Sequence, residues 1–79
     1  MTDPVSWLVV ERGWRVVGPG GEELGHVEDV RGETETDIFS GLAVRHGAFG
    51  RVREVPAERV TEIEDGVVHV DVPDLDALD

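Results

Sequence analysis

Apolar and polar residues alternate along most of the chain, in short runs separated by glycine, proline and acidic residues. This period of two is typical of β strands with one buried and one exposed face, and closely spaced runs of this kind are typical of an all-β sandwich or barrel. The stretch AERVTEI, residues 57–63, is compatible with a short strand or with a single helical turn. Elsewhere the pattern predicts strands near residues 14–17, 24–30, 38–45, 51–55 and 67–72.

The strongest turn signal is the pair Asp65-Gly66, which precedes the run VVHVDV. Glycine tolerates the positive φ that a two-residue hairpin requires. Alternation divides the strand that follows into a core-facing set, Val68, Val70 and Val72, and an outward-facing set, Val67, His69 and Asp71. For the whole chain the pattern predicts a core that contains Val16, Val27, Val44, Val52, Val68 and Val70.

Three segments lie outside the predicted strands. Residues 31–37, RGETETD, are polar and acidic without an apolar period, so we expect an exposed loop. Residues 1–12 contain VSWLVV, which is too apolar for a terminal segment exposed to water, so this segment is expected to pack on the barrel at residues 13–73 or at a homodimer interface. Residues 74–79 form an acidic tail whose two leucines have the spacing of a short C-terminal helical turn, and a frayed end of the chain is an equal alternative.

The glycine-rich stretch GPGG at residues 18–21 raises the question of a phosphate-binding loop. A Walker-type loop requires a lysine after its glycines, and the chain contains no lysine. A dinucleotide-binding loop opens a helix, whereas the residues that follow here contain Gly25 and return to a strand pattern. The stretch is therefore expected to be a tight turn between two strands.

Composition narrows the range of partners. The chain has 79 residues and no cysteine, which fits one small domain held together by its apolar core. It carries 18 Asp and Glu against 7 basic residues, all of them arginine, for a formal net charge of -11. Such a field opposes direct binding to nucleic acid and favours a protein partner with a basic patch.

The longest apolar run, residues 5–10, is too short to cross a bilayer, and a signal peptide's basic leader is missing. A cytoplasmic protein without membrane insertion is expected.

Histidine is the one residue type here that ionises near neutral pH, which makes His26, His46 and His69 candidates for metal binding or acid–base chemistry. They fall on different predicted strands or turns, without the spacing of a ligand pair. A small metal-dependent or hydrolytic enzyme that uses these histidines with nearby carboxylates is the alternative function. Exposed histidines beside acidic neighbours are the more common arrangement, so no catalytic residue, metal ligand or cofactor is assigned.

Several short motifs lie in the stretches GWRVVGPGGEELGHVEDV, residues 13–30, and GRVREVPAERVTEIEDGVVHVDV, residues 50–72. They resemble the PRC-barrel family, the small β-barrel found in the photosynthetic reaction centre H subunit and in a ribosome-maturation factor. The family pattern is an apolar strand, a glycine turn, a Gly-x-Val step, a Val-Pro pair near the fourth strand and a hairpin before the last strand. In this chain these are Val16 and Val17, Gly20 and Gly21, Gly25-His26-Val27, Val55-Pro56 and Asp65-Gly66. The resemblance covers residues 13–73 and implies a PRC-like (SH3-like) antiparallel barrel of five or six strands.

The absence of clustered catalytic motifs, together with this resemblance, favours a non-catalytic interaction or adaptor module that binds a protein partner or forms a homodimer. The apolar N-terminal segment and the acidic loop are the expected binding regions. Their candidate partner or dimer contacts are Trp7, Leu8, Val9, Glu33, Glu35, Asp37, Ile38 and Phe39.

Overall fold

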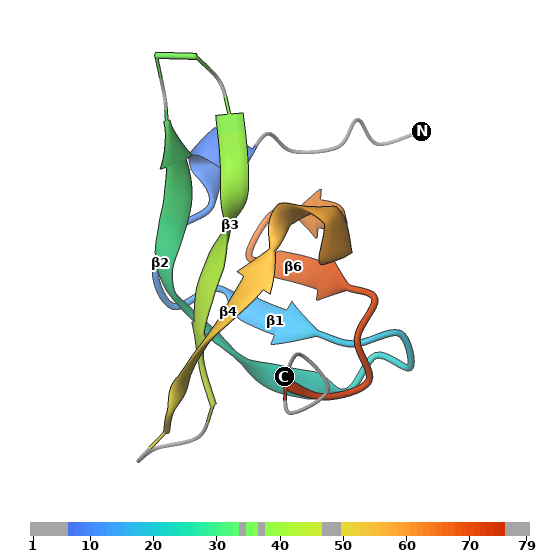
Figure 1. Cartoon of the computed structure of the whole chain (residues 1–79). Helices are drawn as coiled ribbons and strands as arrows, with labels where there is room; N and C mark the ends of the chain where they lie inside the picture. Colours follow the sequence, from blue (N-terminus) through green and yellow to red (C-terminus); the bar gives the residue numbers. More distant parts are fainter. Residues whose placement is uncertain (1–6, 34, 37, 47–49, 76–79) are drawn as a thin grey trace.

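The computed structural model describes residues 7–33, 35–36, 38–46 and 50–75 (Figure 1). The regular elements of this part of the chain are six β strands and two short 3-10 helices, so the fold is all-β, as the alternating pattern predicts. None of these helices is long and apolar enough to cross a membrane. In chain order the elements are η1 (Trp7–Val9), β1 (Arg15–Val17), β2 (Glu23–Glu33), β3 (Ile38–Arg45), β4 (Val52–Pro56), η2 (Ala57–Arg59), β5 (Val60–Glu64) and β6 (Val67–Val70).

All six strands belong to one sheet, in the order β4-β3-β2-β1-β6-β5. Neighbouring strands are antiparallel except β1 and β6, which run parallel with Val16 opposite Val68. The expected antiparallel arrangement is thus confirmed for four of the five neighbouring pairs, and the β1–β6 pair is the exception. The reason is that β4 and β5 run in the same direction, because η2 carries the chain between them without reversing it. The tight β5–β6 hairpin then leaves β6 parallel to β1.

The position of η2 also requires the sheet to curl. Its three residues join β4 to β5, which are the two edges of the sheet, so these edges must lie close together. Among the described residues no ladder connects β4 to β5, so the barrel is open on this side. Figure 1 shows that the end of the β2–β3 hairpin projects beyond the other strands, with η1 beside it.

The inner face of the curled sheet forms the core, in which five of the six predicted valines are buried. The prediction for Val52 is wrong, since this residue is 45% exposed. Val52 pairs with Arg45 on the outer face, whereas Val55 pairs with Leu42 on the inner face. Residues three positions apart lie on opposite faces of a strand, so the two valines cannot share the core. The buried cluster contains Val10, Val16, Leu24, Val27, Leu42, Val44, Val55, Ile63, Val68, Val70, Val72 and Leu75.

The predicted orientation of the last strand is confirmed. The three core-facing valines at positions 68, 70 and 72 are buried, and Asp71 is exposed. Val67 and His69 are half-buried. Residues 57–63 contain both of the alternatives that the sequence allowed, a helical turn in η2 followed by the strand β5.

The predicted loop at residues 31–37 is shorter than expected, because β2 continues to Glu33. Glu33 pairs with Ile38, and Gly32 pairs with Phe39, so pairing across the hairpin keeps this polar segment in a strand. The pattern of its side chains does not predict this pairing. Glu35 lies in the turn, and Asp37 lies outside the described residues. In the C-terminal tail Leu75 is buried, whereas the rest of the expected helical turn, residues 76–79, is also outside them.

The GPGG stretch is a turn between β1 and β2, as predicted. The amide of Gly21 donates a hydrogen bond to the carbonyl oxygen of Gly18 at 3.0 Å, and Gly21 has φ of 86°. The amide of Gly18 in turn donates to the carbonyl oxygen of Glu22 at 2.9 Å. A strand follows the turn, so the helix that a dinucleotide-binding loop requires is not present at this position.

Candidate functional site

Two aromatic rings from distant parts of the sequence meet beside the first residues of β3. Trp7 of η1 and Phe39 of β3 stack with 5.3 Å between ring centroids and 15° between ring planes. Such pairs contribute about 0.5–1.5 kcal/mol beyond the burial of their area. Both side chains are half-buried against the core, so each retains surface for another group to contact.

Gly32 on the neighbouring strand makes room for the Trp7 ring. A Cβ atom at Gly32 would lie 3.0 Å from Cη2 of Trp7 and would also meet the carbonyl oxygen of Ile38. Gly32 pairs with Phe39 next to a register shift in the β2–β3 ladder. The missing side chain therefore allows the indole to approach the β2 backbone closely and to reach Phe39.

The stacked rings form one wall of a groove of about 240 Å³, which we call the Trp7–Phe39 groove. The opposite wall comes from η2 and β5, so the groove lies on the open side of the barrel. Its residues are mostly apolar, a composition typical of sites that accept a side chain from a partner. This second wall consists of Ala57, Val60, Thr61, Glu62 and Ile63.

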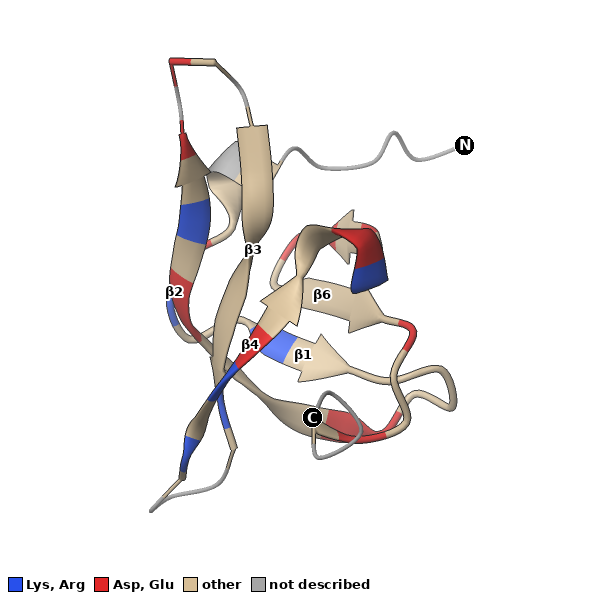
Figure 2. Ribbon diagram, viewed as in Figure 1, with Lys and Arg blue, Asp and Glu red and all other residues tan. Residues whose placement is uncertain are grey.

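Carboxylates occur on the elements that line the groove and at the tip of the neighbouring hairpin. Glu62 lines the groove directly, and Glu58 follows Ala57 on η2 with its side chain exposed. Glu33 and Glu35 are exposed at the tip of the β2–β3 hairpin. Arg59 follows Glu58 on η2, but its positive charge is paired with Asp71, because Arg59 Nη1 lies 3.7 Å from Asp71 Oδ1. The elements η2 and β5 that line the groove thus carry more acidic than basic residues, and Figure 2 shows further acidic residues at the tip of the hairpin.

The structure brings together several of the contacts predicted from the sequence. Trp7 and Phe39 stack, Val9 and Ile38 are 48% and 55% exposed, and Glu33 pairs with Ile38. The Leu8 side chain and Asp37 lie outside what the structure describes. Sequence reasoning missed the second wall, since nothing in the pattern of residues 57–63 shows that this segment faces β3 across the open side of the barrel.

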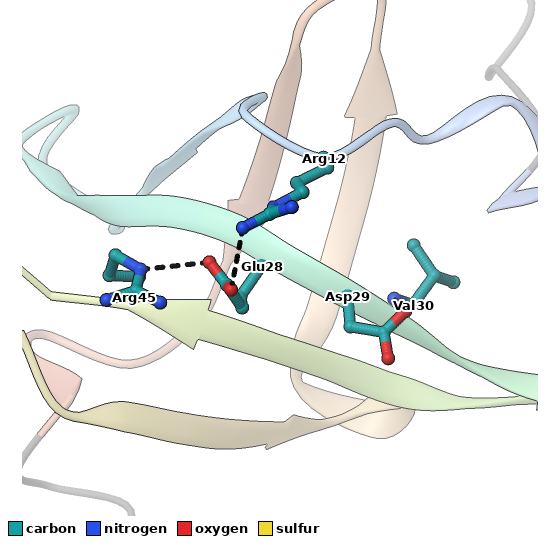
Figure 3. A network of polar contacts seen from close by, with 5 residues as sticks. All are labelled: Arg12, Glu28, Asp29, Val30 and Arg45. Carbon is teal, nitrogen blue, oxygen red and sulfur yellow. Dashed lines mark hydrogen bonds and ion pairs between the residues drawn. The ribbon is translucent and has the colours of Figure 1, made fainter.

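A second concave surface lies on the outer face of β2, β3 and β4, with a volume of about 690 Å³. Its charged side chains are paired with one another (Figure 3). Glu28 accepts hydrogen bonds from Arg45 Nε at 2.9 Å and from Arg12 Nη2 at 3.0 Å. The hydrogen bond from Arg45, with the positive charges of both arginines, holds the pKa of Glu28 below its ordinary value of 4.5, although partial burial opposes the shift.

The rest of this surface is paired in the same way. Arg31 Nη1 lies 3.0 Å from Asp29 Oδ2, and Arg31 Nε lies 3.4 Å from Glu54 Oε1. Asp29 Oδ1 also accepts a hydrogen bond from the Val30 amide. Figure 2 shows the resulting alternation of positive and negative segments along β2 and β4. Arg12, Arg31 and Arg45 each lie beside a carboxylate, so the described residues of this surface offer an anionic ligand little uncompensated positive charge. We therefore take the Trp7–Phe39 groove as the candidate site.

The three histidines contact different groups. His26 Nε2 is 3.6 Å from Glu23 Oε1, and His46 Nδ1 is 2.9 Å from the carbonyl oxygen of Leu24. His69 Nε2 is 3.5 Å from Glu64 Oε2. In the parts of the chain that the structure describes, they do not form a common site.

His69 does belong to a group of potential metal ligands with Glu62 and Glu64, whose ligand atoms lie within 4.8 Å of one another. Carboxylates and imidazole are ligands suited to zinc or manganese. Both glutamates are exposed, and the His69 side chain is 32% exposed. Exposed acidic groups are also common on strands that bind no metal. We describe this group as the acidic outer face of the β5–β6 hairpin.

The family model of the PRC-barrel domain matches residues 12–76. The chain belongs to the PRC-barrel family. The match begins before β1 and ends just after Leu75, so it includes all six strands of this PRC-barrel domain. Trp7 and the rest of η1 precede it, so one of the two rings in the aromatic wall of the groove comes from outside the matched region. A search of the curated proteins finds no match to this chain.

Proposed function

We propose that this PRC-barrel domain is a non-catalytic interaction module that binds a protein partner at the Trp7–Phe39 groove. Domains of this family typically lack enzymatic activity. The observation that carries the proposal is the pair of stacked, half-buried aromatic rings that forms a wall of an apolar groove. Tryptophan and other aromatic side chains in such positions supply much of the affinity in protein interfaces.

The charge of the molecule supports a basic partner. The net charge is -11, and Glu33 and Glu35 extend the acidic surface beyond the groove. Charges at the edge of an interface mainly increase the rate of association and its specificity, while buried apolar contacts supply affinity. The alternative is that acidity serves solubility alone. Neutralising Glu33, Glu35 and Asp37 would then leave the association rate and its dependence on salt unchanged.

The test is to compare partner capture by the wild-type chain, by Phe39→Ala and by Val52→Ala. Phe39→Ala removes half of the aromatic stack, whereas Val52→Ala removes an exposed apolar side chain from the outer face, away from the groove. Proteins retained by the wild type and by Val52→Ala but lost with Phe39→Ala support the proposal. Far-UV circular dichroism confirms that both variants are folded. Equal capture by all three proteins contradicts it.

Self-association is a second candidate, favoured by the exposed Val9 and Ile38 close to the aromatic pair. Sedimentation velocity of the wild type and of Ile38→Ser distinguishes the two candidates. If the wild type is a homodimer through this surface, the variant is expected to sediment as a monomer. If the wild type is itself a monomer, the result favours binding of a different protein at the groove.

A further inference from the structure

The Trp7–Phe39 groove runs along the edge of β5. Val60 and Ile63 face the core, since they pair with Val70 and Val68 of β6. Glu62 faces outward, yet it lines the same groove. Residues on both faces of one strand can border a single groove when that groove lies along the edge of the strand.

This edge of β5 is unpaired in the described part of the chain, where the strand pairs with β6 alone. An edge strand directs alternate N–H and C=O groups away from its neighbour, and these groups can bind another extended chain. The sequence VTEIE of β5 is rich in β-branched residues and contains no proline. The other edge, β4, carries Arg53 and ends at Pro56, features that discourage pairing.

A β-bulge limits the length of the segment that could pair. The β5–β6 register shifts between Val60 and Glu62, which leaves Thr61 as the additional residue. Bulges twist an edge strand away from continuous pairing. The edge is therefore suited to a short segment of a partner and unsuited to an extended sheet between molecules.

The charge along the edge of β5 determines which kind of partner segment can bind there. Glu62 and Glu64 of β5 and Glu58 of η2 present exposed carboxylates along this edge. A second copy of the chain would bring the same carboxylates together between two molecules that each carry a net charge of -11, which is unfavourable. A basic segment would place positive side chains beside them.

We propose that the partner of this domain binds as a short, extended, basic segment that adds a strand to the free edge of β5 and inserts an apolar side chain between Trp7 and β5. This inference rests on the proposed function, because it specifies how the partner uses the same groove. Backbone hydrogen bonds to β5 provide the common mode of binding, and the alternating apolar and basic side chains provide selectivity.

The test uses the full chain and synthetic peptides about seven residues long, slightly longer than a typical strand. In the parent peptide lysine alternates with valine and phenylalanine. Two derivatives carry N-methyl groups on alternate backbone amides, one derivative for each alternate set. Strand addition requires one set of amides, so one derivative is expected to bind about tenfold more weakly, the loss expected for one or two hydrogen bonds, and the other as well as the parent.

Amide hydrogen exchange then locates the peptide. We expect slower exchange at alternate residues of β5 and unchanged exchange in β4. Combined Glu62→Gln and Glu64→Gln changes are expected to weaken binding about two- to thirtyfold at low salt, the range for two exposed charge pairs. Glu11→Gln with Glu22→Gln removes the same charge from exposed positions outside the groove and serves as the control.

Equal binding of both methylated peptides, with effects confined to Trp7 and Phe39, would overturn strand addition but leave the groove as the binding site. No binding of the basic peptide, or equal binding of a glutamate-containing peptide, would also overturn the inference. Protection of β5 by dimerisation without peptide would assign the edge to a second copy instead. The proposed function is contradicted by a different result, namely partner capture that is unchanged in Phe39→Ala.

Discussion

The face of β4 on which a valine lies determines how much that valine contributes to the stability of the fold. Val55 is fully buried opposite Leu42, and Val52 is 45% exposed. Val55→Ala is expected to lower the free energy of unfolding by about 1–3 kcal/mol, through lost burial and a cavity. Val52→Ala should change it by no more than about 0.5 kcal/mol. Urea unfolding followed by circular dichroism measures both, and equal losses would contradict the register in which β3 and β4 pair.

Glu28 is the residue whose titration should affect stability. Arg45 and Arg12 lower its pKa below 4.5 in the folded protein, so its carboxylate stabilises the fold above that pH. This contribution is lost as the pH falls through the lowered pKa, when Glu28 is protonated. Glu28→Gln is therefore expected to unfold at lower urea concentration than the wild type at pH 7, with the difference disappearing in acid. A difference that persists unchanged well below the lowered pKa would show that packing, and not charge, is responsible.

The β2–β3 hairpin depends on the close approach permitted by Gly32. In Gly32→Ala the new methyl group meets the Ile38 carbonyl oxygen and the Trp7 ring, which we expect to cost about 1–3 kcal/mol through overpacking and to displace the indole. Gly20→Ala is a matched control, because its Cβ meets the flexible end of the Glu22 side chain. Urea unfolding and tryptophan fluorescence report the two effects. A Gly32 variant as stable as the Gly20 variant would show that the hairpin can shift to accept a side chain.

Charge is a property of the molecule as a whole, and its net value of -11 destabilises the compact state by repulsion. Salt should relieve this repulsion as the Debye length falls from about 30 Å at 0.01 M to about 3 Å at 1 M. The surface ion pairs weakened at the same time contribute about 0–1 kcal/mol each. We therefore expect the midpoint of urea unfolding to rise with sodium chloride. A falling midpoint would mean that local pairs such as Glu28 with Arg45 outweigh the repulsion.

Alternation of apolar and polar residues was sufficient to predict an all-β fold and the inward orientation of Val68 and Val70, and the glycines of GPGG predicted the turn. These features depend on neighbours in the chain, because successive side chains of a strand point to opposite faces and glycine allows tight turns. The short PRC-barrel motifs likewise depend on local spacing, and the match to residues 12–76 confirms the family.

Tertiary structure decided the features that depend on residues distant in sequence. The continuation of β2 to Glu33 depends on cross-strand pairing, and the parallel β1–β6 pair depends on η2 joining the two sheet edges without reversing the chain. The sequence singled out Trp7 and Phe39 as candidate contacts, but not the wall of the groove from η2 and β5. That wall faces the aromatic pair because the sheet curls, and curling is a property of six strands together rather than of any one segment.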